Sequence, residues 1–553
     1  MHMFTLILAL ALQSTTTGFT PDQLWQDWPD ERFVTTPAPC LRPADLTAQL
    51  QSLAEAYPGS IQLEEIGQSI QGRPIHMITL GNGPHTVLLW SQMHGDEPSA
   101  TPALLDIAHF LLSRANEPEA AVILDDLTLL MIPMLNPDGS QIYERRNQQA
   151  IDINRDGLQL TTPEGQILKR IRDESEPMLG FNLHDQGRRT AVGDTGVLAT
   201  NSVLAVSGDA EGTVTPGRAR AKRACSAIVG TLTPFIPGGV ARFDEDWNPR
   251  AFGDNITSWG TPVVLIESGG LPPGRDFGDL TRLNFVAIVT VLQELARNDL
   301  EDYDPEVYEN LPRNRRDAWA DVVVLGGSIQ QPRNSPSYRA DLAFNIEVDD
   351  RDLAGCATGH DPRSYIADIG DAQFLGAGRV VDASDSLLVV PFAAGVEGWK
   401  ARRWLSAEAL SEVARLGVGT VFWKVASGKT DAAKALADGL AGVGRARLEV
   451  VSRQAEMPWL TLTGPPGRAQ SDLLPDVIEA LVGTKGGMQK MSPLNLDQLC
   501  WVPKTAARQP VLRRGRPASF VLLSPAKDGE VDPAATHLAA IFINGLEVKG
   551  DSR

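Results

Sequence analysis

Polar residues that lie far apart in this sequence have the types needed to hold one metal ion. His94 and Glu97 stand in the stretch His-Gly-Asp-Glu, and His184 ends the apolar stretch Phe-Asn-Leu-His. Two imidazoles and a carboxylate are the ligand set of a catalytic zinc ion that keeps its fourth position open for water. The first pair alone is a weak signal, but a histidine without a partner at the end of an apolar strand would be costly. We therefore predict that these three residues bind a metal ion.

A second group of residues could supply charges around that ion. Arg145 and Arg155 are candidate cations for a substrate carboxylate, to which a planar guanidinium offers a bidentate match, and Asn154 adds an amide beside them. Glu267 ends the apolar stretch Val-Val-Leu-Ile and is a lone carboxylate suited to proton transfer. Together with the metal ligands, this set predicts a hydrolytic enzyme.

The elements around these residues alternate between strands and helices. Compact apolar runs predict strands and helical periodicity predicts helices, and their alternation argues for an α/β sheet flanked by helices. His94, Asn136, His184 and Glu267 fall at or just after the end of a predicted strand, where the sites of such sheets gather. Strands are expected at 86–91, 127–133, 179–183 and 262–266, after a strand pair within 66–81, and helices at 44–56, 98–113, 164–173, 218–232 and 280–297.

The stretch 136–156 carries the most specific pattern, N-P-D-G followed by R-x-N and then by D-I-N-R. With H-x-x-E before it and the later His and Glu after it, the chain resembles the carboxypeptidase A/B-type zinc metallocarboxypeptidase family over about residues 44–298. That family's pattern runs H-x-x-E, N-P-D-G, R-x-N-x-x-G-x-D-x-N-R, a later H and a strand that ends in E. All parts occur here in order, with Ala150 in place of the usual Gly. The resemblance implies a mixed, twisted sheet flanked by helices.

The resemblance also implies a metal and a general base. His94, Glu97 and His184 would bind one Zn²⁺ per catalytic domain and leave a position for a water whose pKa the ion lowers to about 7. Glu267 would take the proton of that water and pass it to the leaving amine. His/His/Glu with an open position suits zinc better than other divalent ions.

The arginines and Asn154 would act on the substrate. Arg145, which the R-x-N spacing favours over Arg146, would stabilise the oxyanion. Asn154 and Arg155 would hold the terminal carboxylate of the substrate, as the resemblance implies.

The chain departs from the family pattern near the substrate. Digestive members carry a tyrosine before the catalytic Glu that closes over the substrate, and no tyrosine occurs between residues 185 and 266 here. The lid is therefore expected to be missing or replaced, with Trp247 as a candidate. The acidic residues in 244–254 could favour a basic terminal residue, although a solvated acidic loop is the simpler interpretation; they are Asp244, Glu245, Asp246 and Asp254.

Length, composition and charge bound the class of protein. At 553 residues, 42% hydrophobic and 22% charged, the chain is typical of a soluble globular protein with two or three domains. Its net charge of −19 repels phosphate backbones and argues against nucleic acid as a partner. Four cysteines lie far apart without a C-x-x-C pair, so disulfides and unpaired buried thiols remain alternatives.

The N-terminal residues 1–18 are expected to be a signal peptide. The apolar run 4–12 is too short to span a bilayer but fits the central region of a secretory signal, although no Lys or Arg precedes it. We therefore expect an exported protein, periplasmic or secreted, with no membrane span in its mature form.

The remaining chain is expected to form a catalytic domain at 19–300, a charged, Pro-containing linker at 301–317 and an accessory domain at 318–553. The accessory domain is predicted to be a β-rich α/β domain. Residues 318–392 and 511–549 weakly resemble the split β-domain of amidohydrolases, but Val390-Pro391 is not followed by His-x-His, the first metal ligands of those enzymes. The intervening stretch is too short for a barrel of about 250 residues. We expect this domain to be non-catalytic.

The leading functional hypothesis is a zinc metallocarboxypeptidase that removes the C-terminal residue of an extracytoplasmic peptide. Its partner would be a peptide or peptide-like substrate with a free C-terminal carboxylate. A deacylase of N-acyl amino acids, similar to aspartoacylase and succinylglutamate desuccinylase, and a cell-wall peptide amidase are alternatives from related chemistry. A catalytically inactive peptide-binding protein is an alternative from a different class.

Overall fold

The structure is a computed structural model that describes residues 18–389, apart from 244–245, 273, 331–337, 348, 357–362 and 383–386, and isolated strands beyond residue 389. The chain divides into two compact units, Met1–Asp317 with Leu353–Cys356, and Ala318–Asp352 with Ala357–Arg553. The expected signal peptide lies outside the described residues, except for Gly18. Among the helices that the structure describes, none has the length and apolar character needed to cross a membrane.

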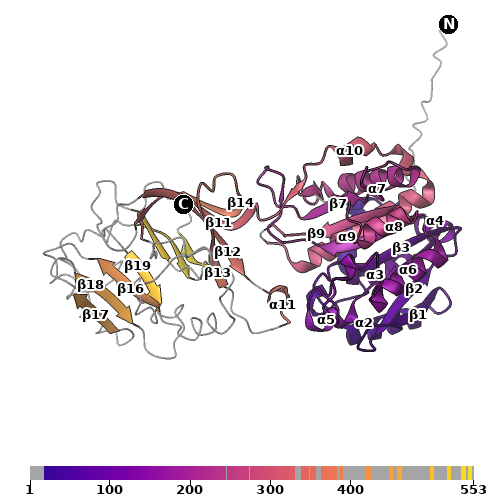
Figure 1. Ribbon diagram of the computed structural model, residues 1–553, viewed down its shortest axis with the longest axis horizontal. Coiled ribbons are helices and arrows are strands. Elements are labelled where there is room, and N and C mark those ends of the chain that lie inside the picture. Colours follow the sequence, from indigo (N-terminus) through magenta and orange to yellow (C-terminus); the bar gives the residue numbers. More distant parts are fainter. Residues whose placement is uncertain are drawn as a thin grey trace, which may run out of the picture. The chain divides into compact units, whose positions relative to one another are not determined.

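The first unit is built on an eight-stranded mixed sheet in the order β1-β2-β4-β3-β5-β9-β7-β8 (Figure 1). The central strands β4, β3, β5 and β9 are parallel, whereas β1 pairs with β2, β2 with β4 and β7 with β9 in antiparallel fashion. The strands are β1 (Ile61–Gln68), β2 (Pro74–Leu80), β3 (His85–Ser91), β4 (Leu127–Ile132), β5 (Leu179–Asp185), β7 (Asn201–Ala205), β8 (Val240–Arg242) and β9 (Val263–Ser268). The expected mixed sheet is confirmed.

Helices cover both faces of this sheet, as Figure 1 shows. The helices are α1 (Pro21–Glu31), α2 (Pro43–Ala56), α3 (Ala100–Ser113), α4 (Pro118–Asp126), α5 (Pro137–Ile142), α6 (Pro163–Ser175), α7 (Pro216–Leu232), α8 (Phe252–Ser258), α9 (Phe277–Arg297) and α10 (Pro305–Glu309), with short 3₁₀ turns η1 (Ala38–Cys40), η2 (Ile153–Arg155) and η3 (Asp299–Asp302). One buried core lies between the sheet and helices that include α3, α7 and α9, and a second lies on the α6 and α8 side. The helices predicted from periodicity are confirmed.

Local sequence explains where the longer helices begin. Pro163 and Pro216 stand at the first position of α6 and α7, where the missing N–H is not needed. The preceding Thr162 and Thr215 cap these helices, because their side chains accept hydrogen bonds from backbone N–H groups of the first turn.

Alternation along the central strands decides which side chains face the second core. In β3, Val87 and Leu89 belong to the first core, and Leu88 and Trp90 to the second. By the same alternation, the side chains at the carboxyl ends of β5 and β9 that follow Leu183 and Ile266 face the α6 and α8 side.

The segment predicted to be a linker is folded, so that prediction is wrong. Residues 301–317 contain the end of η3, α10 and β10 (Asn314–Arg315). Tyr308 is fully buried, and its hydroxyl accepts a hydrogen bond of 3.1 Å from the backbone N–H of Ala205. Glu309 forms an ion pair of 2.6 Å with Arg242. The many charges of this stretch suggested a solvated tether, but its few apolar side chains anchor it to the first unit.

Three of the four cysteines can be assigned as disulfide-bonded or free. Cys40 is bonded to Cys356 with their Cα atoms 5.7 Å apart, and Cys225 is a buried free thiol. The side chain of Cys500 lies outside the described residues. Disulfides persist in oxidising compartments, so this bond is consistent with export.

The second unit is described mainly by its strands. A five-stranded sheet has the path β13-β12-β11-β14, with β15 paired to β11, and two further sheets hold β16–β19 and β20–β22. The elements are β11 (Trp319–Gln330), β12 (Tyr338–Glu347), α11 (Asp350–Leu353), β13 (Arg363–Gly370), β14 (Gly376–Asp382), β15 (Leu387–Val389), β16 (Gly419–Lys424), β17 (Arg447–Ser452), β18 (Pro458–Thr463), β19 (Leu499–Pro503), β20 (Phe520–Ser524), β21 (His537–Ile543) and β22 (Leu546–Gly550). The non-catalytic role of the accessory domain stays a prediction.

Candidate metal centre

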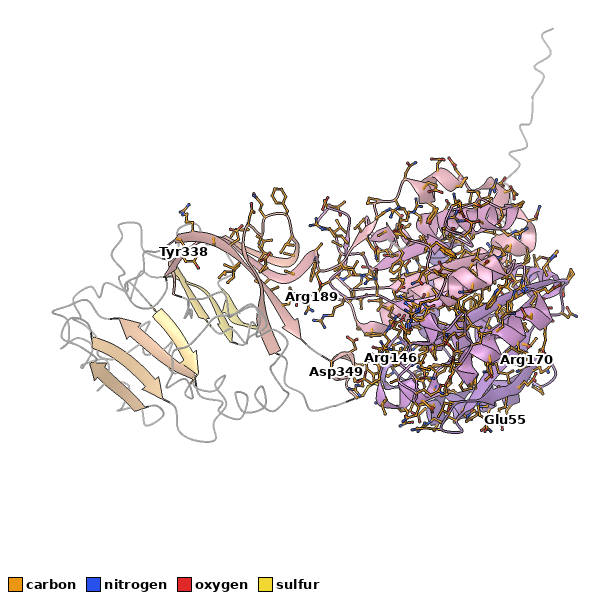
Figure 2. The ribbon with its side chains drawn as sticks, viewed as in Figure 1. Glu55, Arg146, Arg170, Arg189, Tyr338 and Asp349 are labelled. Carbon is orange, nitrogen blue, oxygen red and sulfur yellow. A yellow bond between two sulfur atoms is a disulfide. The ribbon has the colours of Figure 1, made fainter. Side chains whose placement is uncertain are left out.

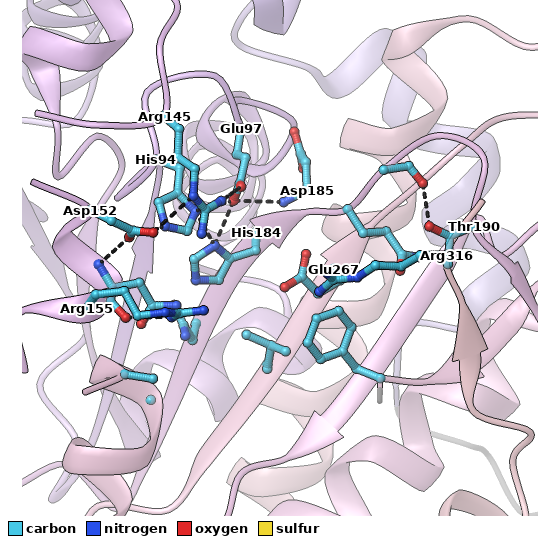
Figure 3. A pocket seen from close by; sticks show the side chains of 18 of the residues that line it. His94, Glu97, Arg145, Asp152, Arg155, His184, Asp185, Thr190, Glu267 and Arg316 are labelled. Atoms are coloured by element: carbon cyan, nitrogen blue, oxygen red, sulfur yellow. Dashed lines mark hydrogen bonds and ion pairs between the residues drawn. The ribbon is translucent and has the colours of Figure 1, made fainter. Parts of the chain in front are cut away.

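Three side chains predicted to bind a metal converge at one point of the first unit. His94, Glu97 and His184 are buried, and one ligand atom of each lies within 4.8 Å of the others. The Oε2 atom of Glu97 is 2.8 Å from Nδ1 of His94 and 2.7 Å from Nδ1 of His184. The two Nδ1 atoms are 3.1 Å apart. The structure therefore brings together residues from β5 and from the loop after β3 (Figure 3).

The loop after β3 is shaped by a left-handed residue and a close backbone approach. Gln92 has a φ of 51°, and its buried amide donates to the carbonyl of Gly95 and to the hydroxyl of Ser140. A Cβ on Gly95 would lie 2.1 Å from the backbone carbon of Gly139, so only glycine fits there. This packing holds His94 and Glu97 on either side of Gly95.

The Asn-Pro-Asp-Gly stretch joins this loop to the loop of Arg145. The Oδ1 atom of Asn136 accepts from the backbone N–H of Gly139 and caps α5. Its Nδ2 atom donates to the carbonyls of Met93, at 3.2 Å, and of Arg145, at 3.4 Å. Asn136 was expected near the site, and the structure places it behind the site as a connector of the two loops.

His184 and Glu267 reach the site from adjacent parallel strands. They are register partners in the pairing of β5 with β9, and both side chains are buried. Strand alternation directs both to the α6 and α8 side of the sheet. The proposed ligand and the proposed base are therefore fixed by the same backbone ladder.

A carboxylate that the sequence analysis did not single out orients the first histidine. Asp152 accepts from Nε2 of His94 at 3.0 Å, which leaves the lone pair of Nδ1 directed at Glu97 and His184. Asp152 also accepts from Nε of Arg145 at 3.1 Å. Its position in the D-I-N-R stretch was the available signal, because a carboxylate behind a metal-binding histidine is a common partner.

The pKa values of the three proposed ligands are shifted in different directions. Burial raises the pKa of Glu97, but the two neighbouring imidazoles outweigh it and hold this pKa well below its usual value. Burial lowers the pKa of His184. Burial acts in the same direction on His94, yet Glu97 and Asp152 outweigh it and raise the pKa of that ring. A neutral ring at His184 beside an ionised carboxylate suits metal binding, which requires deprotonated ligands.

The geometry of these donors fits a small divalent cation. Ligands about 2.0–2.1 Å from a tetrahedral ion are separated from one another by about 3.3 Å. The separations of 2.7, 2.8 and 3.1 Å are close to that edge length. Two lone-pair nitrogens facing each other need a cation or a proton between them. The donor set of two imidazoles and one carboxylate is that of catalytic zinc sites.

Arg145 lies against this cluster. Its Nη1 donates to Oε1 of Glu97 at 2.8 Å and lies 3.0 Å from Nδ1 of His94, and its side chain is 40% exposed. Arg146, the alternative, is exposed and donates to the carbonyl of Ala150. The structure therefore places Arg145, and not Arg146, at the site.

Asn154 and Arg155 stand on η2 at one wall of the site. The Oδ1 atom of Asn154 accepts from the backbone N–H of Phe252 at 2.8 Å, which ties η2 to the start of α8. Arg155 is half-buried and donates from Nη1 to the carbonyl of Asn154 at 2.7 Å. Both side chains line the cavity described next.

A cavity of about 590 Å³ opens onto the cluster. Its size is within the range of cavities that hold small ligands, about 300–1,000 Å³. The predicted metal ligands, the predicted base and the predicted substrate-binding residues all line it, and so do residues to which the sequence analysis assigned no role. The predicted ones are His94, Glu97, Arg145, Asn154, Arg155, His184 and Glu267, and the others include Asp152, Asn182, Arg189, Phe243 and Arg316.

The lid candidate Trp247 and the acidic residues of 244–254 can now be placed relative to the cavity. Trp247 is 37% exposed and lines a smaller, separate depression rather than this cavity. Phe243 lines both, so it is the nearer aromatic side chain among the described residues. Asp254 is buried in the wall and accepts from the backbone N–H of Asn248. Asp244 and Glu245 lie outside the described residues.

Comparison with known proteins bears directly on the first half of the site. Residues 46–174 match the family model described as zinc carboxypeptidase, which confirms the expected resemblance for this part of the chain. This segment carries His94, Glu97, Arg145, Asn154 and Arg155 and ends before the strands that carry the later histidine and glutamate. The structure brings these later residues to the same cavity.

Several curated proteins are similar to the chain over this part. Carboxypeptidase E of Caenorhabditis elegans is 32% identical over 134 residues, which are 20% of this chain and 28% of that protein. Carboxypeptidase M of Mus musculus is 28% identical over 188 residues, 29% of this chain and 42% of that protein. The chain thus spans less than half the length of these relatives. A solved putative carboxypeptidase of Burkholderia mallei shows a TM-score of 0.39 at 17% identity and covers 46% of this chain and 68% of that one.

Proposed function

Because residues 46–174 carry the sequence of the zinc carboxypeptidase family, we propose that this chain is a zinc metallocarboxypeptidase that hydrolyses the C-terminal peptide bond of an extracytoplasmic peptide. One observation carries the proposal. A buried His94–Glu97–His184 cluster and Glu267 line the same cavity as the guanidinium of Arg155. A metal site, a base and a cation for a carboxylate are what removal of a terminal residue requires.

His94, Glu97 and His184 are the proposed ligands of one Zn²⁺. A divalent ion held there would lower the pKa of a water molecule and would polarise the scissile carbonyl. Asp152 keeps His94 in the tautomer that presents Nδ1. A set of three protein ligands supports this proposal, because catalytic zinc sites with three protein ligands keep one position for water or substrate.

Glu267 is the proposed general base. It takes a proton from the attacking water and delivers it to the leaving amine, so it must be close to the reacting atoms without binding the ion. Its register pairing with His184 meets this need, because neighbouring strands are about 4.8 Å apart. Glu267 therefore stands one strand away from a ligand.

The arginines are proposed to bind oxygen atoms on either side of the scissile bond. Arg155, with Asn154, binds the terminal carboxylate of the substrate through charge-assisted hydrogen bonds. Arg145 stabilises negative charge that develops on the scissile carbonyl oxygen. Its contact with Glu97 and Asp152 fixes the guanidinium beside the metal ligands before substrate arrives.

Export is part of the proposal, with periplasmic or secreted location. The Cys40–Cys356 disulfide supports it, because such bonds form and persist in oxidising compartments. The strongly acidic charge of −19 supports a peptide rather than a nucleic acid as partner.

The test is incubation of the full chain, loaded with zinc or treated with a chelator, with peptides that differ only in the last residue. Mass spectrometry should detect loss of one C-terminal residue, and the chelator should abolish it. Glu267→Gln, loaded with zinc, is the matched control for a contaminating peptidase. Cleavage of N-acyl amino acids with no cleavage of any peptide would instead favour the deacylase alternative, and release of cell-wall peptide alone would favour the amidase.

A further inference from the structure

The outer wall of the cavity is built by a segment that follows the last long helix of the first unit. Strand β10 (Asn314–Arg315) pairs antiparallel with β6 (Ala191–Val192), in the register Asn314↔Val192 and Arg315↔Ala191. The next residue, Arg316, therefore stands close to Thr190, and both line the cavity. Arg189, one position before Thr190, lines it too.

This two-stranded ribbon is tied to the strand ends that carry the proposed catalytic groups. The Nδ2 atom of Asn314 donates to Oε1 of Gln186 at 2.8 Å, and Gln186 lies two positions after His184. The backbone N–H of Gln186 donates to the carbonyl of Ser268, the residue after Glu267. Hydrogen bonds therefore fix the β6–β10 ribbon at the wall of the cavity.

Two consecutive arginines at the end of β10 have different surroundings. Arg315 forms an exposed ion pair with Asp194. Arg316 lines the cavity. Asp317 follows with a φ of 54°, a left-handed conformation that costs a non-glycine residue about 1–2 kcal/mol and ends the ribbon at the cavity. Conformations of this kind cluster at functional sites.

Two arginines of the cavity differ in whether they form ion pairs with the protein. Arg145 is paired with Glu97 and Asp152. Arg316 forms no ion pair with any residue in the described part of the chain. In Figure 3, His184 and Glu267 lie in the middle of the cavity. Arg155 lies on one side of this pair, and Arg316 lies on the opposite side. The proposed reacting centre thus lies between the guanidinium groups of Arg155 and Arg316.

We propose that Arg316, assisted by Arg189, binds a carboxylate on the acyl side of the substrate, and that this enzyme prefers peptides with an acidic residue immediately before the terminal one. The inference rests on the proposed function. With the terminal carboxylate at Arg155 and the scissile bond at His184 and Glu267, the chain of the substrate runs towards the ribbon. A carboxylate side chain there meets a guanidinium that it matches in charge and shape.

The test compares matched N-acylated dipeptides that end in the same residue and carry Glu or Gln before it. The zinc-loaded full chain should show a kcat/KM about tenfold higher for the Glu peptide, as expected for a partly exposed charge pair. Arg316→Gln should bring the two values together by lowering only the first. Arg315→Gln, one position away and directed to Asp194, is the control and should keep the preference.

A charge reversal and a binding measurement complete the design. Arg316→Glu should favour a peptide with Lys before the terminal residue over the Glu peptide. Calorimetric affinities of zinc-loaded Glu267→Gln for the Glu and Gln peptides, with and without Arg316→Gln, report the same contact without turnover. Both preferences should weaken at high salt, because partly exposed charges are screened.

The outcomes separate the two proposals. Cleavage of both peptides with equal kcat/KM, or a preference that survives Arg316→Gln, overturns the role of Arg316 and leaves the carboxypeptidase intact. Cleavage of neither peptide by the zinc-loaded protein overturns the proposed function. Equal affinities of Glu267→Gln for the two peptides in that case overturn the role of Arg316 as well.

Discussion

His184 and Glu267 are paired residues on the parallel strands β5 and β9, and both side chains point to the same side of the sheet. A strand pair inside an eight-stranded sheet is among the stiffest parts of a domain, and here the register partners one position before the ends of both strands are a proposed ligand and a proposed base. Their separation is therefore set by the ladder and not by loop conformation. This relationship makes the roles of the two residues separable by mutation.

Glu267→Gln should abolish turnover and keep the metal. The substitution conserves size, so the strand and the cluster of His94, Glu97 and His184 should persist, while the amide cannot accept a proton. We expect a fall in kcat of about a hundredfold or more, with zinc content per chain unchanged by atomic emission. Retained turnover would show that another group is the base.

His184→Ala should lose the metal together with the activity. Its removal leaves two of the three proposed ligands, which are too few to retain the ion. His76→Ala is the matched control, because His76 is a half-buried histidine of the same sheet whose Nε2 lies 3.3 Å from Thr47, outside the cluster. Zinc content after dialysis, measured for both variants, should fall only for the first. A fully loaded His184→Ala protein would remove this residue from the ligand set.

Arg155→Gln should weaken the capture of the terminal carboxylate. Loss of a charge-assisted hydrogen bond costs about 1.5–3 kcal/mol, which is about a ten- to hundredfold fall in kcat/KM. Arg146→Gln is the control, since this neighbouring arginine is exposed and donates to the carbonyl of Ala150. Steady-state kinetics on one good peptide distinguishes them. Equal effects of the two substitutions would argue against a specific role for Arg155.

Ala150→Gly should stabilise the protein. Ala150 has a φ of 59°, a left-handed conformation that a glycine adopts without strain, and it stands where the resembling family carries glycine. The strain of about 1–2 kcal/mol exceeds the extra unfolded-state entropy of glycine, about 0.4–1 kcal/mol. Ala48→Gly in the exposed face of α2 is the control and should destabilise. Thermal melting of both variants checks the opposite signs, and a fall for both would contradict the strain.

Sequence reasoning could predict the strands, helices and cluster, because each rests on local signals. Apolar runs indicate β3, β5 and β9, and the residue types at or just after their ends indicate the proposed ligands. It missed Asp152 as the partner of His94, although the D-I-N-R stretch carried a signal. It could not predict Arg316 as a cavity residue, since that position depends on segments that meet across the fold. The charged stretch at 301–317 was misread because charge patterning gives no sign of one buried tyrosine that anchors a segment.

The stability of the first unit should decrease as pH rises from about 4 to about 7. Asp106 on α3 is fully buried, and burial raises its pKa to about 7 although it accepts from Trp28 Nε1 and from the backbone N–H groups of Phe33 and Val34. In this window the folded protein holds a proton on Asp106 that the unfolded chain has released, so stability falls as pH rises. The loss can reach about 4 kcal/mol by proton linkage. Urea titrations at pH 5 and pH 8 measure it.

Asp106→Asn tests that assignment, because it removes the titrating group and keeps the shape. The variant should be less stable than the parent at pH 5, since an amide nitrogen faces the Trp28 donor, yet its stability should change much less between pH 5 and pH 8. Asp45, an exposed acidic residue in the first turn of α2, supplies the control substitution Asp45→Asn, which should keep the parental pH dependence. An equal loss of unfolding free energy between pH 5 and pH 8 in the parent and in Asp106→Asn would contradict this assignment. It would show that the carboxyl of Asp106 is ionised at both pH values, because its three hydrogen-bond donors outweigh the effect of burial.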